Sequence, residues 1–352
     1  MNSLVIIANF PFNKSGGVGT YVLGRTQELL MNSTVTVLGR GDSCVCDGIN
    51  YVSLGPVSNN VKSFFNNWFN LMKIVKRGQW NHIEIHNIPM ALPIILCSFN
   101  YHYFFHGPAD AEAKVEGKSR FKIFIARALD RFILNRASRV SVVSLYFYNY
   151  LLKRYSTLEN RLSIIEPKFI LSKHQKDEKL ISSMIKPDRT NVVIVRRLVE
   201  RTGVYNFLKF FLDIDHPNKN DFHFHICGLG PQLNLIKNLQ SENPHLLTVY
   251  GRVTEIKKQS LYAGCNFNLV PSVALEGFGL VLVEGALQGC PSVVSNIGAM
   301  PDIIKSFKYF GSIYDQSVEG FYESAKVVCG FSQKNRRELK EFAKRKYLID
   351  KS

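Results

Sequence analysis

Short apolar runs alternate with amphipathic segments along the whole chain. The first apolar run, residues 4–9, is followed by a group of glycines and then by an amphipathic segment at residues 20–30. Buried parallel strands are continuous apolar runs, whereas surface helices repeat their apolar positions about every 3.6 residues. The alternation therefore predicts α/β architecture, with a doubly wound parallel sheet covered by helices on both faces.

In the first half of the chain this pattern predicts a series of strands and helices. Strands are expected at residues 4–9, 34–38, 49–54, 82–86, 101–105 and 139–143. Helices are expected at residues 20–30, 61–75, 120–136 and 145–155. The apolar stretch at residues 88–105 is interrupted by Pro89, Pro93 and Asn100, so a short helix and a strand fit it better than a membrane span.

Residues 168–188 are polar and rich in lysine, and the same alternation then begins again. Strands are expected at residues 192–195, 222–226, 247–251, 267–270 and 291–295. Helices are expected at residues 203–211, 233–239, 254–263 and 298–304, with another that starts near residue 279. A chain of 352 residues also exceeds the usual size of a single core. We therefore expect two Rossmann-like domains, residues 1–168 and 189–352, joined by a linker region with a lead-in helix at residues 169–188.

The chain is basic, with 44 Lys and Arg against 28 Asp and Glu and a formal net charge of +16. Both halves carry the excess, +9 in residues 1–170 and +7 in residues 171–352. Such a balance suits a phosphorylated small molecule, an acidic membrane surface or nucleic acid. No recognised nucleic-acid motif accompanies the charge, so we expect no nucleic-acid partner.

The cysteines and the first ten residues indicate in which cellular compartment the protein is expected. The seven cysteines form no CxxC pair, which favours reduced, mostly buried thiols in a cytoplasmic protein. Residues 1–10 lack the basic start and long apolar core of a signal peptide and fit a buried strand. We expect no transmembrane helix. Residues 61–75 carry aromatic residues between lysines, and two interpretations stay open: a helix on the anionic inner face of the cell membrane, or a core helix with a solvated basic side.

Two glutamates, Glu276 and Glu284, bracket a glycine turn and an apolar helix start in the stretch EGFGLVLVEGALQGCP, residues 276–291. A strand, a glycine turn and a helix start expose backbone amides that bind anions, and a nearby carboxylate can bind sugar hydroxyls. The stretch therefore predicts a ligand in which a sugar is bonded to a phosphate. Because Glu284 lies more than one turn into the helix, the two carboxylates should contact different parts of that ligand.

Three arginines, Arg196, Arg197 and Arg201, follow the first strand of the second half. Their guanidinium groups match a diphosphate in charge and in hydrogen-bond geometry. The alternative is a solvated loop with structural ion pairs. No Asp-x-Asp metal motif is evident, so we expect the arginines to replace a divalent ion, with no metal and no cofactor.

In the first half, Gly16, Gly17 and Gly19 follow the first strand with the spacing GGVG, which is not the GxGxxG of dinucleotide-binding proteins. Alone, this loop could equally serve as a tight crossover. His86 and His106 follow two other strands, at the edge where parallel sheets bind ligands. His106 is therefore a candidate catalytic residue.

Several segments, in this order and spacing, resemble one family. They are GGVGTYV (16–22), HN (86–87), HGP (106–108), SVVS (141–144), VRRLVERTG (195–203), GLGP (228–231), YGRV (250–253), LVPSVALEGFGLVLVEGALQGCPSVVS (269–295) and GAMPD (298–302). Together they resemble the retaining GT-B glycosyltransferases of the large glycogen-synthase and mannosyltransferase-like family, known as glycosyltransferases group 1, family 4.

The resemblance implies two Rossmann-like domains facing across a cleft, with a nucleotide-sugar donor on the C-terminal domain and the acceptor on the N-terminal one. Glu276 would bind the hydroxyls of the transferred sugar and Glu284 the ribose. Arg197 and Arg201 would stabilise the diphosphate, and His106 would lie beside the reacting carbon. The other donor-binding positions are Gly17, Val18, Gly19, Arg196, Gly228, Gly251, Arg252, Val253, Phe278, Gly279 and Leu280. The expected acceptor is a saccharide or lipid-linked saccharide of bacterial surface polysaccharide or glycolipid assembly.

The chain departs from this family at three places. Thr202 stands where the family usually has lysine, and Arg201 could supply the missing charge. Residues 165–168, IEPK, replace a common proline-asparagine-glycine turn. The helix with which relatives commonly end is expected to be short or absent after Tyr347.

Two other functions stay open from the sequence. A sugar-nucleotide epimerase or a phosphorylase would have a similar two-domain fold, although no context for a pyridoxal-binding lysine stands out. A protein of a different class, a basic module that binds nucleic acid or a membrane surface, would also explain the charge of +16.

Overall fold

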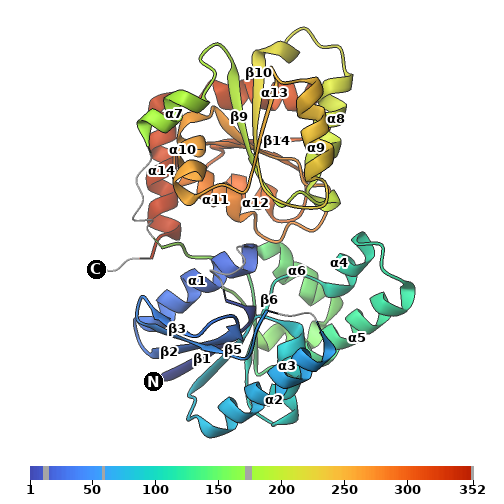
Figure 1. Cartoon of the computed structure of the whole chain (residues 1–352), viewed down its shortest axis with the longest axis vertical. Helices are drawn as coiled ribbons and strands as arrows, with labels where there is room; N and C mark the ends of the chain where they lie inside the picture. Colours follow the sequence, from blue (N-terminus) through green and yellow to red (C-terminus); the bar gives the residue numbers. More distant parts are fainter. Residues whose placement is uncertain (11–15, 58–59, 171–176, 350–352) are drawn as a thin grey trace. The chain divides into compact units, whose positions relative to one another are not determined.

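The computed structural model of the chain describes residues 1–10, 16–57, 60–170 and 177–349. The chain forms two compact units, Met1–Leu171 with Ile349–Ser352 and Ser172–Leu348 (Figure 1). Each unit consists of a sheet with flanking helices, which confirms the predicted α/β class.

The first unit contains an eight-stranded sheet in the order β3-β4-β2-β1-β5-β6-β7-β8. Its strands are β1 (Asn2–Asn9), β2 (Thr34–Arg40), β3 (Cys44–Cys46), β4 (Ile49–Ser53), β5 (His82–Ile85), β6 (His102–Phe105), β7 (Arg139–Val142) and β8 (Leu162–Ile164). Its helices are α1 (Gly17–Leu30), α2 (Val61–Arg77), α3 (Ile88–Leu96), α4 (Ala109–Val115), α5 (Arg120–Arg136), α6 (Leu145–Arg154) and the 3₁₀ turn η1 (Ser156–Arg161). Strand β3 pairs antiparallel with β4, and the other pairings are parallel.

The second unit contains a six-stranded parallel sheet in the order β11-β10-β9-β12-β13-β14. Its strands are β9 (Thr190–Val195), β10 (Phe222–Cys227), β11 (Leu247–Gly251), β12 (Phe267–Val270), β13 (Ser292–Ser295) and β14 (Gly311–Tyr314). Its helices are α7 (Glu178–Met184), α8 (Val204–Asp213), α9 (Leu233–Glu242), α10 (Glu255–Gly264), α11 (Leu280–Ala286), α12 (Met300–Ser306), α13 (Val318–Cys329) and α14 (Gln333–Tyr347), with 3₁₀ turns η2 (Glu200–Thr202) and η3 (Lys219–Asp221).

In both sheets the early strands are added on one side of the first strand, and the later strands are added on its other side. The chain moves outward from β1 to β2 and β4, then returns to the other side of β1 with β5. In the second unit it moves from β9 to β10 and β11, then returns beside β9 with β12. Because crossovers between parallel strands are right-handed, each reversal places the later helices on the opposite face. The sheets are therefore doubly wound, and their ligand sites are expected where the order reverses.

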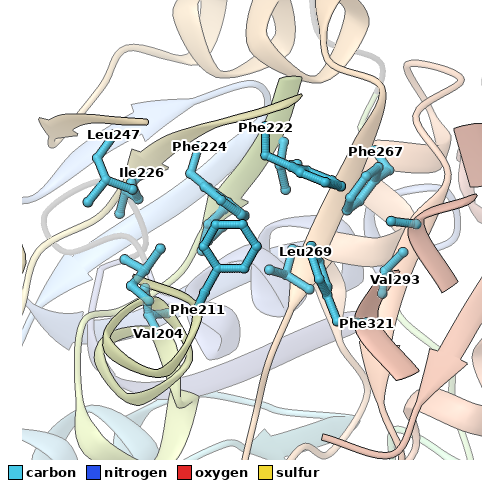
Figure 2. Packing of buried hydrophobic residues seen from close by; sticks show 14 of the residues in the cluster. Val204, Phe211, Phe222, Phe224, Ile226, Leu247, Phe267, Leu269, Val293 and Phe321 are labelled. Atoms are coloured by element: carbon cyan, nitrogen blue, oxygen red, sulfur yellow. The ribbon is translucent and has the colours of Figure 1, made fainter. Parts of the chain in front are cut away.

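The core of the second unit is packed with aromatic side chains. Phe211 of α8 and Phe321 of α13 meet Phe222 and Phe224 of β10 and Phe267 of β12 (Figure 2). The rings of Phe211 and Phe224 lie edge to face with centroids 4.9 Å apart, which their quadrupoles favour. This packing holds β9, β10 and β12 in place, and the loops of the candidate site leave from their carboxyl ends.

The structure corrects several expectations about elements. Six elements were not predicted from the sequence, namely β3, β8, β14, α4, α13 and α14. The final helix α14 is 15 residues long, begins with a capping box between Ser332 and Asn335 and ends at Tyr347. The expectation of a short or absent helix after Tyr347 stays a prediction, because the structure describes only residues 348 and 349 beyond it. After it, the N–H of Ile349 donates to the carbonyl of Phe169 over 3.0 Å, and the chain rejoins the first unit.

The region proposed as a linker contains α7, which packs against α10 of the second unit. The N–H of Asp177 donates to Ser260 Oγ of α10 over 3.1 Å, and Asp177 caps α7. Among the described residues, the helix therefore belongs to the second unit.

The seven cysteines are free, but Cys227, Cys265 and Cys290 alone among them are buried. The expectation of mostly buried thiols is wrong because Cys44 and Cys46 lie on the edge strand β3. No helix in the described parts of the chain combines the length and the apolar character needed to cross a bilayer.

Candidate functional site

The loops that follow β9 and β12 meet through a buried ion pair. Arg196, directly after β9, donates to Glu276 Oε2 over 2.5 Å and to Ser272 Oγ over 2.8 Å. Ser272 Oγ donates to the same carboxylate oxygen over 3.2 Å. The side chains of Arg196 and Glu276 are 8% and 12% exposed. Burial alone would raise the pKa of Glu276, but the attraction of Arg196 outweighs it and holds that pKa below its ordinary value. Glu276 is thus an ionised carboxylate at the point where the second sheet reverses.

The three arginines of this loop have different surroundings. Arg196 is engaged with Glu276, so a structural ion pair, the alternative left open by the sequence, is present here; its Nε atom is buried without a hydrogen-bond partner. Arg197 is exposed, and Arg201 Nη1 donates to the carbonyl of Leu275 over 3.4 Å. Arg197 and Arg201 therefore remain the candidates for contact with a diphosphate.

Thr202 does not supply the positive charge of the lysine that the family resemblance implies at this position. Its side chain is buried, and its hydroxyl donates to the carbonyls of Arg197 and Val199 over 2.8 and 2.7 Å. Gly203 follows with a φ of +69°, and a Cβ there would collide with the carbonyl of Pro271. Thr202 therefore closes the turn that brings the β9 loop against the end of β12.

The glycine turn after Glu276 begins α11 as predicted. Gly279 has a φ of +79°, a conformation that glycine adopts without steric cost, and α11 starts at Leu280. Phe278 is buried, with its ring edge to face against Tyr347 of α14 at 6.0 Å between centroids. The carbonyl of Glu276 accepts from the N–H of Ala299 over 3.0 Å, which fixes its backbone.

Glu284 lies in α11, apart from Glu276, and pairs with a lysine of α10. Lys258 Nζ lies 3.2 Å from Glu284 Oε2 and 3.0 Å from Glu255 Oε2. The side chains of Lys258 and Glu284 are 18% and 17% exposed. Burial raises the pKa of Glu284, and the ammonium group of Lys258 offsets part of that rise. The two carboxylates of the motif thus have separate cationic partners.

The candidate residues Gly228, Gly251, Arg252 and Val253 lie at the carboxyl ends of β10 and β11. Gly228 lies beside the loop that follows β9. The N–H of Gly228 donates to the carbonyl of Gly251 over 2.8 Å, and a Cβ on Gly228 would collide with the carbonyl of Arg196. Gly228 is therefore required by the close approach of two backbones. Arg252 is exposed and Val253 is half-buried.

In the first unit, Gly17, Val18 and Gly19 form the first turn of α1 and not a separate loop. The helix begins at Gly17 because Gly16 is its N-cap residue in an extended conformation. First-turn N–H groups have no acceptor within their own helix, so this end of α1 keeps the capacity to bind an anion. The segment between β1 and Gly16 lies largely outside the described residues.

His86 and His106 follow the neighbouring strands β5 and β6 and touch, as their strand-end positions indicated. His86 Nδ1 lies 3.0 Å from His106 Nε2, and the rings are stacked at 5.3 Å between centroids. Tyr21 of α1 packs edge to face on His106 at 5.1 Å. Burial lowers the pKa of both histidines, so both are neutral at pH 7.

Behind His86 lies Glu84, a fully buried carboxylate that sequence reasoning missed. Arg25 Nη2 donates to its Oε1 over 2.6 Å, and His82 Nε2 lies 2.8 Å from the same atom. Burial opposes ionisation, but these hydrogen bonds and Arg25 hold the pKa of Glu84 well below its ordinary range. His86 Nε2 lies 3.6 Å from Glu84 Oε2. Because a carboxylate only accepts, it favours a proton on that Nε2, which leaves Nδ1 of His86 to accept from His106. Nδ1 of His106 is then free to accept a hydrogen bond.

Among the described residues, His82, Glu84 and His102 could in principle hold a metal ion, since their ligand atoms lie within 4.8 Å of one another. Arg25 already supplies a positive charge to Glu84, and His102 Nε2 lies 2.7 Å from Ser141 Oγ. These contacts account for the cluster, and we assign no metal to it.

Ser272 and Lys258 are further residues that sequence reasoning did not assign. Ser272 was visible as part of the PS pair before the glycine turn. Lys258 carried no signal, because a lysine on an amphipathic helix is ordinarily solvated.

Two doubly wound units, each with a polar cluster where its strand order reverses, define the GT-B class of fold. The family model described as Glycosyl transferases group 1 matches residues 175–346. This match covers most of the second unit and none of the first 174 residues.

Solved structures share this fold across the whole chain. Sucrose-phosphate synthase from Thermosynechococcus elongatus superposes with a TM-score of 0.79 at 15% identity, covering 99% of this chain and 95% of that one. Alr3699/HepE of Anabaena, solved with UDP and glucose, superposes with a TM-score of 0.72 at 15% identity, again covering 99% and 95%. At these identities the likeness shows the fold.

A curated relative covers part of the chain. The uncharacterized glycosyltransferase MJ1178 of Methanocaldococcus jannaschii is 28% identical over 178 residues, which are 47% of this chain and 47% of that protein. The match thus spans about half of each protein.

Proposed function

We propose that the protein is a retaining glycosyltransferase that moves a sugar from a nucleoside diphosphate sugar to an acceptor hydroxyl. The observation that carries the proposal is the arrangement of Glu276 and Glu284. Each is a buried carboxylate with its own cation, and both lie in the loop and helix that follow β12, beside the reversal of the sheet. The match of the second unit to the group 1 family model, and the UDP and glucose of the Anabaena structure, support a nucleotide-sugar donor.

The two carboxylates have different tasks in this proposal. Glu276, held ionised and oriented by Arg196 and Ser272, accepts hydrogen bonds from hydroxyls of the transferred sugar. Glu284 accepts from the ribose hydroxyls. Neither acts as a nucleophile.

The diphosphate is bound by Arg197 and Arg201, with the amides near Phe278, Gly279 and Leu280, and by Gly17, Val18 and Gly19 from the first unit. The residues around Gly228, Gly251, Arg252 and Val253 lie near the base. His106 lies beside the reacting carbon, with Nδ1 able to accept from a sugar hydroxyl.

In the transfer, the bond between the sugar carbon and the diphosphate oxygen breaks, and a bond from the same carbon to the acceptor oxygen forms on the same face. The leaving phosphate oxygen takes the proton of the acceptor hydroxyl, and the nucleoside diphosphate departs. Negative charge develops on the leaving group, where preorganised guanidinium groups stabilise it, so the proposal needs no divalent metal.

The acceptor that we propose is a saccharide or lipid-linked saccharide of bacterial surface polysaccharide or glycolipid assembly, met in the cytoplasm. The charge of +16 supports an anionic partner, and an acceptor that carries a lipid diphosphate would provide one.

The test begins with a thermal-shift screen of nucleoside diphosphates and their sugars, followed by transfer assays with the donor that stabilises the protein most. Glu276→Gln should lower the turnover number about 10²–10³-fold, as loss of a transition-state hydrogen bond does. Glu319→Gln, an exposed glutamate of α13, is the matched control and should retain wild-type turnover.

Each part of the proposal has an opposing result. Absence of stabilisation by every nucleoside diphosphate would remove the donor assignment. An altered sugar nucleotide formed without acceptor would show an epimerase. Inversion at the anomeric carbon, read by NMR, would exclude retention, and loss of activity in a chelator would exclude metal independence.

A further inference from the structure

The outward side of α5 is apolar. Phe121 is 71% exposed, Phe124 67%, Phe132 43% and Ile125 41%. A surface helix ordinarily turns its apolar residues inward and its polar residues to water. Helix α5 therefore presents an apolar surface that nothing in the described chain covers.

These side chains form one stripe. With a rotation of about 100° per residue, Phe121, Phe124, Ile125 and Phe132 fall within a sector roughly 100° wide. Ile133 and Leu134, which are fully buried, lie on the other side of the helix. The exposed stripe is thus separate from the face by which α5 packs on its own unit.

Basic side chains border the stripe on both sides. Residues 118–136 contain six basic residues and one acidic residue, a net charge of +5. The basic residues are Lys118, Arg120, Lys122, Arg127, Arg131 and Arg136. The acidic residue, Asp130, is 3% exposed. Arg127 is paired with Asp110 of α4 over 3.0 Å but is still 61% exposed. The exposed surface of α5 therefore combines aromatic and aliphatic groups with positive charge and offers no exposed carboxylate of its own.

We propose that α5 docks this protein onto an anionic lipid bilayer, lying parallel to the surface with the stripe among the acyl chains and the basic residues at the headgroups. Aromatic and aliphatic side chains gain free energy by leaving water, and each Lys or Arg near an anionic surface adds to the attraction. A helix of 17 residues, about 25 Å long, gives this contact without crossing the membrane.

A second copy of the chain is a poorer occupant of the same surface. In a symmetric dimer the same patch meets itself, so the six basic residues of one copy would approach those of the other. Like charges brought together oppose association, whereas anionic headgroups neutralise both flanks.

Two helices, α2 and α5, are candidates for the membrane contact, and their exposed side chains distinguish them. Residues 61–75 were the sequence-based candidate for membrane contact, and α2 exposes Phe65 at 58% and Phe69 at 65%. Its other aromatic side chains pack together, with Phe64 and Trp68 at 5.0 Å between centroids. Helix α5 has four exposed apolar residues in one stripe with flanking charge on both sides, so we assign the membrane contact to α5.

Docking does not depend on the proposed transferase activity, and the test separates the two. The full chain is sedimented with vesicles of phosphatidylcholine alone and of phosphatidylcholine mixed with phosphatidylglycerol. We expect binding to the mixed vesicles that weakens as salt is added. Phe121→Ser with Phe124→Ser should weaken that binding tenfold or more, and Lys122→Glu with Arg131→Glu should do likewise.

Matched controls accompany both variants. Phe65→Ser with Phe69→Ser removes equally exposed aromatics from α2, and Lys237→Glu with Lys334→Glu makes the same change in net charge on the second unit. Both should bind vesicles within twofold of wild type. Thermal stabilisation by a nucleoside diphosphate is measured on every variant and should persist, because its site is elsewhere.

Three results would overturn the proposal. The first is no binding to anionic vesicles, and the second is equal binding by the α5 variants and wild type. The third is a concentration-dependent dimer, seen by light scattering, that the α5 changes abolish while vesicle binding stays intact; that result would assign the stripe to a second copy of the chain. Loss of diphosphate stabilisation in wild type would affect the proposed function and leave this inference standing.

Discussion

The guanidinium of Arg196 and the carboxylate of Glu276 lie in a site that water barely reaches. Each charge has lost most of its hydration, which three charge-assisted hydrogen bonds offset: one joins Arg196 to Glu276, and the hydroxyl of Ser272 makes one with each of the two charged groups. Removing one partner from such a pair is more damaging than removing both, because the remaining charge stays buried. The arrangement makes Arg196 a positioning residue for the carboxylate that we assign to the sugar.

Arg196→Met should therefore destabilise the protein by about 3 kcal/mol at pH 7, as the loss of one partner of a buried pair does. Arg197→Met, next in sequence but exposed, should cost under about 0.5 kcal/mol. Denaturant unfolding measures both. The folded pKa of Glu276 lies below its ordinary value of 4.5, so the pair contributes stability at neutral pH and loses it as pH falls through the folded pKa. The deficit of Arg196→Met should shrink in acid; equal losses in the two variants would contradict the argument.

The sequence predicts those parts of the site that lie within one short segment of the chain, and it does not predict contacts between distant segments. The positions of Glu276, Gly279 and Glu284 were read from a turn and a helix start within ten residues, and the structure has that turn and helix. The partners Arg196 and Lys258 lie 80 and 26 residues from those carboxylates. Their pairing depends on which strands are neighbours in the sheet, which no local pattern contains. For the same reason Glu84 reads as an interruption of an apolar strand until Arg25 is seen beside it.

At the junction of α4 and α5, Asp130 shows how a helix can carry a carboxylate on its buried face. Its Oδ2 accepts from the N–H of Ala109 over 3.0 Å, at the first residue of α4. Its Oδ1 is buried without a hydrogen-bond partner. Burial raises the pKa of Asp130 to about 7, so the folded protein holds this carboxyl neutral below about pH 7.

Asp130→Asn should make the protein more stable at pH 8 and leave its stability nearly unchanged at pH 4. The folded pKa of about 7 exceeds the ordinary value of 3.8, so in wild type the folded state binds the proton more tightly and stability falls as pH rises between these values. Asparagine keeps the carbonyl acceptor and cannot ionise. The gain at pH 8 should be on the order of 2–4 kcal/mol, from about 1.4 kcal/mol per pKa unit.

Thermal unfolding across pH 4–8 measures this gain, with exposed Asp188→Asn as the control. A gain that is the same at pH 4 and pH 8 would show that ionisation is not its cause.

Helices and strands were predictable from the sequence where their burial requires a regular pattern of apolar residues. Strands such as β1, β10 and β12 are apolar runs because both of their faces are covered, and α5 was predicted with its observed bounds. Strand β3 has three exposed residues, and β14 is short and half-buried, so neither presents a run that distinguishes it from a loop. The amphipathic period of residues 120–136 predicts that a helix forms there. It does not predict which side of α5 packs against the rest of the unit, because exposed Phe121 and buried Ile133 are both apolar.

The two units differ in what they contribute to the proposed reaction. Arg196, Glu276, Glu284 and Lys258 all lie in the second unit, which also has a core of its own built around Phe211, Phe224 and Phe321. Among the described residues, the ion pairs and the serine hydrogen bond that orient the two carboxylates are made within that unit. The histidine pair and α5 belong to the first unit. The residues that we propose for donor binding thus lie mainly in the second unit, and His106 and the basic apolar stripe lie in the first.

The second unit alone, residues 177–348, should therefore fold and bind the nucleoside diphosphate part of the donor. We expect one cooperative unfolding transition, since a core of this size supports a domain. The diphosphate that stabilises the whole chain should stabilise the isolated unit too, by about 2.7 kcal/mol at one hundred times its dissociation constant.

Any loss of affinity relative to the whole chain measures what the first unit adds to the binding of the nucleoside diphosphate. Glu284→Gln in the isolated unit should weaken a nucleoside diphosphate and leave pyrophosphate binding unchanged, because the proposed partner of this carboxylate is the ribose. A folded unit that binds no diphosphate, beside a whole chain that does, would show that the donor site needs both units and would move its main determinants away from Glu276 and Glu284.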